Sequence, residues 1–127
     1  MKLARQILLF FVALWAVAAQ AQQYPWTPPA VEAKLALRSD PNGIVVPEMR
    51  VVRRNDILIV QADLSNTFDI DRVLFYRFRW LDNIGSQVGD GESWKQLKVL
   101  GRAQQTIKSV APTSAAVDFR LEMNVEP

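Results

Sequence analysis

Residues 117–125 read Val-Asp-Phe-Arg-Leu-Glu-Met-Asn-Val, and this stretch indicates the fold class. Its apolar members are Val117, Phe119, Leu121, Met123 and Val125, and the polar members between them are Asp118, Arg120, Glu122 and Asn124. A period of two is typical of a β-strand with one face in a core and the other in water. We therefore expect a protein built from half-buried strands.

Similar segments precede this one along the chain, separated by turn-forming residues. The expected strands are 34–38, 44–54, 57–66, 72–81, 95–100, 103–111 and 117–125. Asp40-Pro41-Asn42-Gly43 and Asn55-Asp56 are the clearest turn signals. Roughly seven strands at spacings of about ten residues, without a convincing amphipathic helix, predict an all-β sandwich. Residues 30–37 are the one stretch whose pattern also allows a helix.

The segment 44–54 differs from the others because Pro47 interrupts it. Proline cannot donate a hydrogen bond to a neighbouring strand, so it predicts an edge strand or a bulge. An open edge strand can accept a strand from another chain. The segment 44–54 is therefore a candidate for binding by strand addition.

The segment 72–81 is the most aromatic of the chain. Its residues Leu74, Tyr76, Phe78 and Trp80 share one face, which favours a central strand in the core over an exposed stacking platform for sugars. Arg77 and Arg79 point from the other face. If strand 117–125 is a neighbour, its outward residues Asp118, Arg120 and Glu122 are in phase with these arginines, and the acids among them could neutralise them.

The N-terminus is predicted to be a secretory signal peptide. Lys2 and Arg5 precede an uncharged apolar run at 7–19, which is short for a membrane-spanning helix. The cleavage signal comprises Ala19, Ala21 and Gln22. We expect a signal peptide at 1–21, an extended Pro-rich leader at 22–31 and one β-domain at 32–127, with an uncleaved N-terminal anchor as the alternative.

Removal of this segment changes the charge of the chain. The chain contains 15 Lys and Arg and 13 Asp and Glu residues. Lys2 and Arg5 leave with the signal peptide, so 15 − 2 = 13 basic residues face 13 acidic ones. A general attraction to nucleic acid needs a basic excess. Nucleic acid is therefore not an expected partner.

The chain has no cysteine and no histidine. This composition excludes thiol nucleophiles, Ser-His-Asp triads, Cys/His metal sites and a lipid anchor on cysteine. The carboxylates of Asp69-Ile70-Asp71 and Gly89-Asp90-Gly91-Glu92 lack the spacing of a calcium loop, and turn chemistry is the favoured interpretation for both. We expect a protein without catalytic residues, cofactor or metal.

Several motifs in the second half resemble the YcfL family of small envelope proteins from Gram-negative bacteria. They are Ser65-Asn66, the run 76–82 (Tyr-Arg-Phe-Arg-Trp-Leu-Asp), Gly85, Trp94, Ala111-Pro112 and Phe119-Arg120-Leu121. The resemblance covers about residues 58–123. It implies an immunoglobulin-like β-sandwich in the periplasm without an established activity. Many family members are lipoproteins, whereas this chain lacks the lipid-bearing cysteine.

Two groups of residues are candidates for binding. Candidate partner anchors are Tyr24 and Trp26 in the leader and Trp94, which follows a glycine-containing loop and alternatively closes one end of the core. Candidate anion-binding residues are Arg77, Arg79, Arg50, Arg53 and Arg54, which alternatively are solvated or paired with acids.

These observations favour a non-catalytic periplasmic interaction module, a component or accessory of an envelope protein assembly. Its expected partners are envelope proteins, and binding to these proteins would be its means of association with the outer membrane. Self-association is left open. The alternative is a module that binds an anionic glycan or lipid headgroup through the arginine-rich strand face.

Overall fold

The alternating stretch at the C-terminus forms strand β7 (Asp118–Val125) in the computed structural model, which describes residues 25–127. Phe119, Leu121, Met123 and Val125 are buried, as the alternation predicts. Val117 was expected on the same buried face, but 47% of it is exposed because the strand begins one residue later. The predicted signal peptide and cleavage residues Ala19, Ala21 and Gln22 lie outside the described residues.

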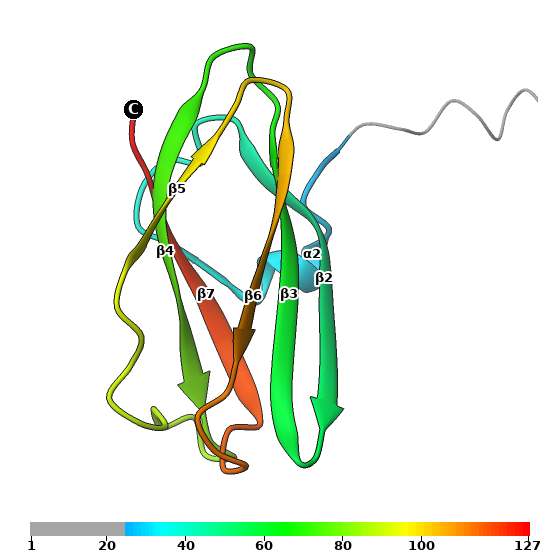
Figure 1. The fold of residues 1–127 in the computed structure, drawn as a ribbon, viewed down its shortest axis with the longest axis vertical. Coiled ribbons are helices and arrows are strands. Elements are labelled where there is room, and N and C mark those ends of the chain that lie inside the picture. The colour runs from blue at the N-terminus through cyan, green and yellow to red at the C-terminus, as the bar shows by residue number, and fades with distance from the viewer. Residues whose placement is uncertain (1–24) are drawn as a thin grey trace, which may run out of the picture.

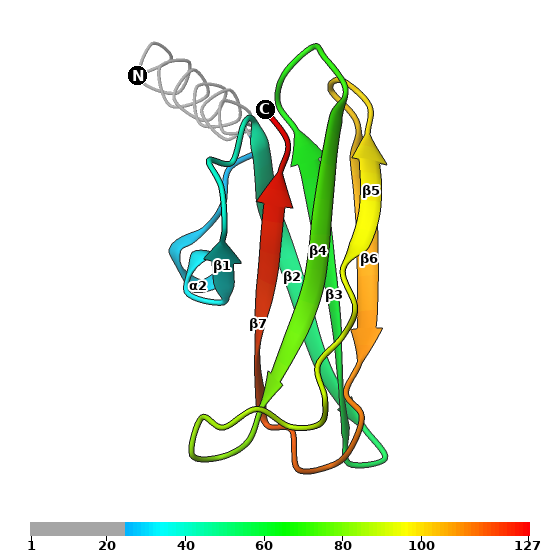
Figure 2. The same ribbon diagram turned by 90° about the vertical axis from the view of Figure 1, so that its left-hand side faces the viewer.

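Within residues 25–127, seven strands form two sheets that pack face to face (Figure 1). The elements before β7 are α2 (Pro29–Glu32), β1 (Leu35–Leu37), β2 (Ile44–Arg54), β3 (Ile57–Asn66), β4 (Arg72–Leu81), β5 (Lys95–Val99) and β6 (Gln104–Val110). One sheet has four strands in the order β1-β7-β4-β5, and the other has three in the order β2-β3-β6. Figure 2 shows the four-stranded sheet in front of the three-stranded one. The predicted all-β sandwich is confirmed.

The strand order is related to that of an immunoglobulin domain. Strands β2, β3 and β6 take the places of A, B and E, while β4, β5 and β7 take those of C, C′ and F. The place of strand G is taken by β1, which comes from the N-terminal end of the domain. β1 pairs with β7 in parallel, with Leu35 opposite Leu121 and Leu37 opposite Met123.

The sequence predicted a leader that is extended up to residue 31, with a helix within 30–37 as an alternative. The structure differs from the extended leader at its end. Residues 29–32 form the short helix α2, which begins with a proline. Proline is tolerated at the first helical position because its missing N–H would have no intrahelical partner there. The described part of the chain contains no helix that is long and apolar enough to cross a membrane.

Strand β2 is an edge strand and also contains a bulge, so both predictions from Pro47 are confirmed. The pairing register with β3 shifts between Val45 and Glu48. The N–H of Val46 donates to Oγ1 of Thr27 in the leader (2.9 Å), which covers the first part of this edge. At the other end of β2, Asn55 and Asp56 have φ angles of 51° and 66°, typical of a type I′ hairpin turn.

The aromatic strand β4 lies in the core as predicted. Phe78 and Trp80 stack with their ring centres 5.9 Å apart, and Phe119 of β7 packs against both at 6.2 and 6.1 Å. Leu74 is also fully buried, whereas Tyr76 is half-buried beside Lys95. Such aromatic pairs add about 0.5–1.5 kcal/mol each to the burial of their surfaces.

Two polar side chains complete the core where strands end. The carboxylate of Glu92 accepts hydrogen bonds from the backbone N–H of Phe78 (3.0 Å), from Trp80 Nε1 (3.1 Å) and from the hydroxyl of Ser109. The sequence analysis interpreted Glu92 as part of a turn-forming segment, but its side chain instead joins the two sheets. The buried Asn66 donates from Nδ2 to the carbonyls of Ile70, Val99 and Leu100.

Candidate functional site

The outer face of the four-stranded sheet gathers the candidate residues of β4 and β7. These strands are antiparallel neighbours, with Arg77 opposite Glu122 and Arg79 opposite Arg120. This face looks toward the viewer in Figure 2. The sequence left open whether the two strands are neighbours. The register shows that they are, and that Glu122 meets the arginines of β4, whereas Asp118 lies opposite Leu81.

Glu122 is the centre of this face, and its burial is unexpected. The alternation places it on the wet side of β7, yet none of its surface is exposed. Arg38, just after β1, donates to its Oε2 from Nη2 (2.8 Å) and Nε (3.2 Å), and Arg77 Nη2 does so at 3.4 Å. Arg79 Nη1 lies 4.0 Å from Oε1. We call Arg38, Arg77, Arg79 and Glu122 the arginine cluster.

The arginines keep Glu122 ionised. Burial raises the pKa of the Glu122 carboxyl, but the hydrogen bond from Arg38 and the charge of Arg77 outweigh it, so the pKa lies below its ordinary value of 4.5. Oε1 accepts no hydrogen bond. Arg79 is therefore the arginine of the cluster that is least committed to the carboxylate.

Trp94 belongs to the same face. The guanidinium of Arg77 lies 4.3 Å from the centre of the Trp94 ring, within the range of a cation–π interaction. Trp94 is 40% exposed and does not join the buried core. The structure thus brings together two candidates that the sequence had placed in different classes, an anion-binding arginine and an aromatic partner anchor.

Charges next to the arginine cluster are paired. Asp118 accepts from Lys34 (2.7 Å) and from Arg120 (3.1 Å). Burial raises the pKa of Asp118, but the hydrogen bonds from Lys34, the Phe119 N–H and Arg120 together lower it below 3.8. The cluster itself holds three arginines and one carboxylate, so 3 − 1 = 2 positive charges remain without an acidic partner within it.

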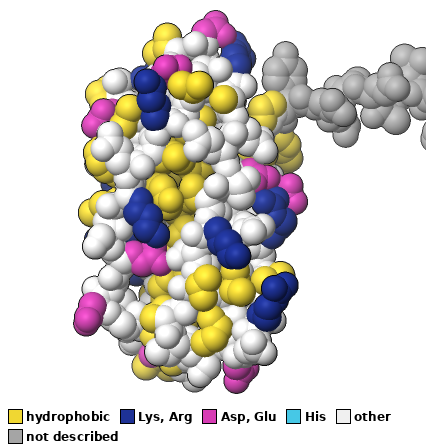
Figure 3. Space-filling model, in the orientation of Figure 1, with side chains coloured by type: hydrophobic (Ala, Val, Ile, Leu, Met, Phe, Trp, Pro, Cys, Tyr) yellow, Lys and Arg dark blue, Asp and Glu magenta, His cyan; other side chains and the backbone are white. Residues whose placement is uncertain are grey.

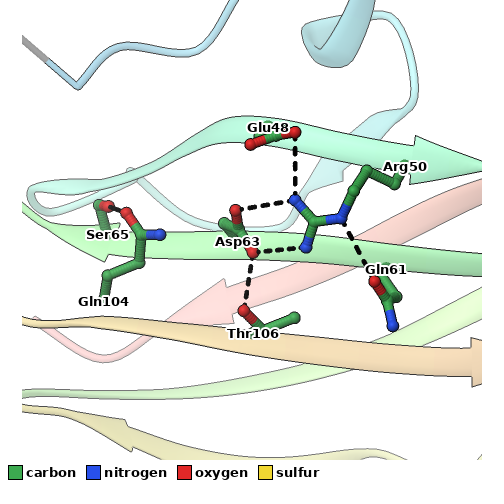
Figure 4. Close-up of polar contacts among 7 residues, drawn as sticks. All are labelled: Glu48, Arg50, Gln61, Asp63, Ser65, Gln104 and Thr106. Atoms are coloured by element: carbon green, nitrogen blue, oxygen red, sulfur yellow. Dashed lines mark hydrogen bonds and ion pairs between the residues drawn. The ribbon is translucent and has the colours of Figure 1, made fainter.

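The second basic group, on β2, lies on the other sheet and is engaged in structural contacts. Arg50 donates to both carboxylate oxygens of Asp63 (2.9 and 3.1 Å) and to Gln61, and it pairs with Glu48 (Figure 4). The hydrogen bond from Arg50 lowers the pKa of Asp63 below 3.8, against the effect of burial. Thr106 donates to the same carboxylate (2.7 Å).

The other arginines of β2 do not join Arg77 and Arg79 either. Arg53 donates to the backbone carbonyls of Asp56 (3.0 Å) and Ala116 (3.4 Å). Arg54 lines a shallow hollow on the outer face of the three-stranded sheet, together with Val52 and Ile59. The five arginine candidates are thus divided between the two sheets.

The leader candidates are separated from the arginine cluster as well. Tyr24 lies outside the described residues. Trp26 is 60% exposed and lines an apolar groove of about 440 Å³. The groove runs between the leader, β1 and β2, where its walls include Leu35, Leu37 and Met123.

Arg38 is the residue of this candidate site that sequence reasoning missed. It binds Glu122 more closely than Arg77 does, although 84 residues separate Arg38 from Glu122. Only the parallel pairing of β1 with β7 brings it to the cluster. On the side seen in Figure 1, by contrast, hydrophobic side chains occupy the middle and both signs of charge are interspersed around them (Figure 3).

Over the described residues, 25–127, the chain is a seven-stranded β-sandwich with an arginine cluster on one outer face. The chain belongs to DUF1425, a family described as a protein of unknown function, whose model matches residues 30–125. No curated protein matches the chain.

Similar solved structures include the following two. The crystal structure of Campylobacter jejuni cj0090 has 25% sequence identity and a TM-score of 0.63, covering 73% of this chain and 98% of its own. A DUF1425 family member from Shewanella sp. pv-4 has 28% identity and a TM-score of 0.56, covering 66% and 77%. Both support the fold, and the second also supports the family.

Proposed function

We propose that this protein is a non-catalytic binding module of the bacterial cell envelope, a YcfL-like member of DUF1425, and that its arginine cluster holds an anionic group of another envelope component. The ligand class is a phosphate or carboxylate borne by a lipid headgroup or a glycan. Export by the N-terminal signal peptide would bring the module to the periplasm.

The observation that carries this proposal is the fixed position of Arg77. Its guanidinium is held between Glu122 and the ring of Trp94. A side chain fixed in this way loses less conformational entropy when it binds a ligand. Planar guanidinium groups match the oxygens of phosphate and carboxylate through paired hydrogen bonds.

The neighbouring arginines complete the site. The side chains of Arg38, Arg77 and Arg79 are 53%, 32% and 44% exposed, so each remains accessible from solvent. Glu122 lies beneath them and holds them close together despite their mutual repulsion. The two positive charges in excess favour an anion, and Arg79 is free to turn toward it.

Vesicle and glycan binding test this function. The protein, purified from cells that express the full chain, is mixed with phosphatidylcholine vesicles, with vesicles that also contain phosphatidylglycerol, and with purified peptidoglycan, at low and high salt. We expect salt-sensitive binding to one of the two anionic materials, since screening weakens contacts between exposed charges. Competition by inorganic phosphate would favour a phosphate ligand over a carboxylate.

A matched pair of variants makes the test specific. Arg77→Ala/Arg79→Ala removes two positive charges from the cluster, and Arg54→Ala/Lys108→Ala removes two from the other sheet. We expect the first variant to weaken binding by about tenfold or more, and the second to leave it nearly unchanged. Equal binding by both variants, or no binding by the unaltered protein, would overturn the proposal.

A second candidate function, membership of an envelope protein assembly, is favoured by the exposed Trp26 on its apolar groove. Exposed tryptophans are enriched at protein interfaces. Chemical cross-linking in intact cells tests it, with Trp26→Ala compared with Ile84→Ala, an exposed loop residue. A cross-linked partner that is lost only with Trp26→Ala supports the assembly, and an unchanged pattern rejects this groove.

A further inference from the structure

The open edge of β2 begins where the leader stops covering it. Val46 donates to Thr27, and Pro47 has no N–H to offer. In Figure 1, α2 lies at the height of the middle of β2, and from there to the arrowhead no described element lies along the open side. The opposite edge of the same sheet stands beside β5, where Gln105 Nε2 donates to the carbonyl of Lys98 (2.7 Å).

The hairpin determines which backbone groups of this edge are free. Arg54 and Ile57 flank the two-residue turn and are paired, and hydrogen-bonded pairs alternate along an antiparallel ladder. The N–H of Ala111 donates to the carbonyl of Leu58, which therefore points toward β6 and away from its β2 partner Arg53. Met49, Val51 and Arg53 thus direct their N–H and C=O groups outward from the sheet.

We infer that this edge pairs with the same edge of a second copy, antiparallel and centred on Val51. In that register Val51 lies opposite Val51 of the second copy, and Met49 opposite Arg53. The residues with free backbone groups face one another, so each copy contributes three N–H donors and three C=O acceptors. A two-fold axis through Val51 closes the contact and yields a dimer with one continuous sheet.

The side chains select this register over its neighbours. On the outer face, Glu48 lies opposite Arg54 of the second copy, which gives two symmetry-related ion pairs, and Arg50 lies opposite Val52. Sliding the second copy two residues either way would place Arg50 opposite Arg50 or opposite Arg54, and like charges directly opposite destabilise a pair. Glu48 is the acidic residue of this free stretch, and its side chain is 61% exposed.

The apolar residues of the free stretch also fit a second copy. Val51 is 48% exposed although it pairs with the fully buried Val60, because no strand of residues 25–127 lies beyond it. Val52 on the other face is 49% exposed. In the dimer the two Val51 side chains cover each other, and Val52 packs on the aliphatic stem of Arg50. The pairing ends at Pro47 on one side and at the Asn55 turn on the other.

A cysteine substitution tests this register directly, because the natural chain has no cysteine. Cα atoms of directly opposed residues in a hydrogen-bonded pair are about 5.5 Å apart, within the range that a disulfide spans. Val51→Cys should form a disulfide-linked dimer on mild oxidation, whereas Val110→Cys, on the opposite edge strand, should not. Equal cross-linking of both variants, or none of Val51→Cys, would overturn the inference.

Sedimentation equilibrium of the purified full-length product provides a second test. Glu48→Arg and Arg54→Glu should each weaken the dimer by about tenfold or more, and their combination should restore it. Val51→Pro should also dissociate the dimer without unfolding the chain, since the lost N–H points away from β3. A monomer at all concentrations, or a dimer that these variants leave unchanged, contradicts the pairing.

Discussion

The indole Nε1 of Trp80 donates a 3.1 Å hydrogen bond to the carboxylate of Glu92, so a loop residue supplies the acceptor that the largest core side chain requires. The other oxygen of the same carboxylate accepts from the Phe78 N–H, at a point where β4 has passed the end of β5. One side chain therefore substitutes for a missing length of strand.

Replacing this carboxylate by an amide is expected to destabilise the fold. Glu92→Gln keeps the shape of the side chain but replaces one accepting carboxylate oxygen by an amide NH₂ group. This donor would face the N–H of Phe78 or of the Trp80 ring, which is also a donor. Unsatisfied buried groups cost about 1–3 kcal/mol, which is the expected fall in the free energy of unfolding. Urea denaturation followed by tryptophan fluorescence measures it. Asp90→Asn, in the same loop but exposed, is the control and should change stability by less than about 0.5 kcal/mol.

Acid is expected to weaken the three-stranded sheet through Asp63. Its pKa lies below the ordinary value of 3.8, chiefly because of the hydrogen bond from Arg50. A carboxyl group whose pKa is lower in the folded than in the unfolded protein stabilises the fold. This contribution is complete at a pH above the pKa of the unfolded state, and it is lost as the pH falls through the pKa of the folded state. The unfolding free energy should therefore decline below about pH 4, with Asp118 and Glu122 contributing in the same direction.

The variant Asp63→Asn isolates this contribution. It should be less stable than the unaltered chain at pH 7, and the difference should shrink toward pH 2. Asp40→Asn, an exposed turn residue, should follow the unaltered chain at every pH. If Asp63→Asn showed the full pH dependence of the unaltered chain, the acid sensitivity would have to come from other carboxylates.

The corner made by Asn66 should be among the most sensitive positions of the domain. Its amide joins the end of β3 to three carbonyls at the start of β4 and the end of β5. Asn66→Ala leaves these acceptors without their donor, and we expect a loss of about 2–3 kcal/mol. Thermal unfolding measures the loss. Asn124→Ala, an exposed residue of β7, is the matched control, and equal effects of the two variants would contradict this role.

Gly101 should not tolerate even one added methyl group. A Cβ at this position would overlap the backbone carbonyl of Asp69, and backbone atoms cannot move aside as a flexible side chain can. Overpacking of this kind costs about 1–3 kcal/mol, which is the expected effect of Gly101→Ala in chemical denaturation. A variant as stable as the unaltered chain would mean that the loop at Asp69 yields readily.

The strands could be predicted from the sequence because period-two alternation and turn residues are local signals. The stretch 117–125 and the aromatic run of β4 show their buried faces directly, and Pro47 marks both the edge and the bulge of β2. A helix was allowed within residues 30–37 only as an alternative, because prolines usually exclude helix, although the first helical position tolerates one; α2 begins at such a proline.

The candidate site could be predicted only in part, since it depends on contacts between distant segments. Arg77 and Trp94 stand out in the sequence, but their stacking depends on how the loop before β5 returns to β4. The burial of Glu122 depends on Arg38, which reaches it only through the parallel pairing of β1. Alternation shows which way a side chain points and does not show what will cover it.

The parallel strand β1 also imposes an order of events on folding. Leu35 and Leu37 are synthesised early, but the residues that they pair with, Leu121 and Met123, are synthesised much later. Closing so long a loop is slow, and contacts of this kind form only once the whole chain is present. The four-stranded sheet therefore cannot be completed on a partly synthesised chain. A chain that still lacks its last strand has no neighbour to join β1 to β4, so these two strands stay apart until β7 is in place.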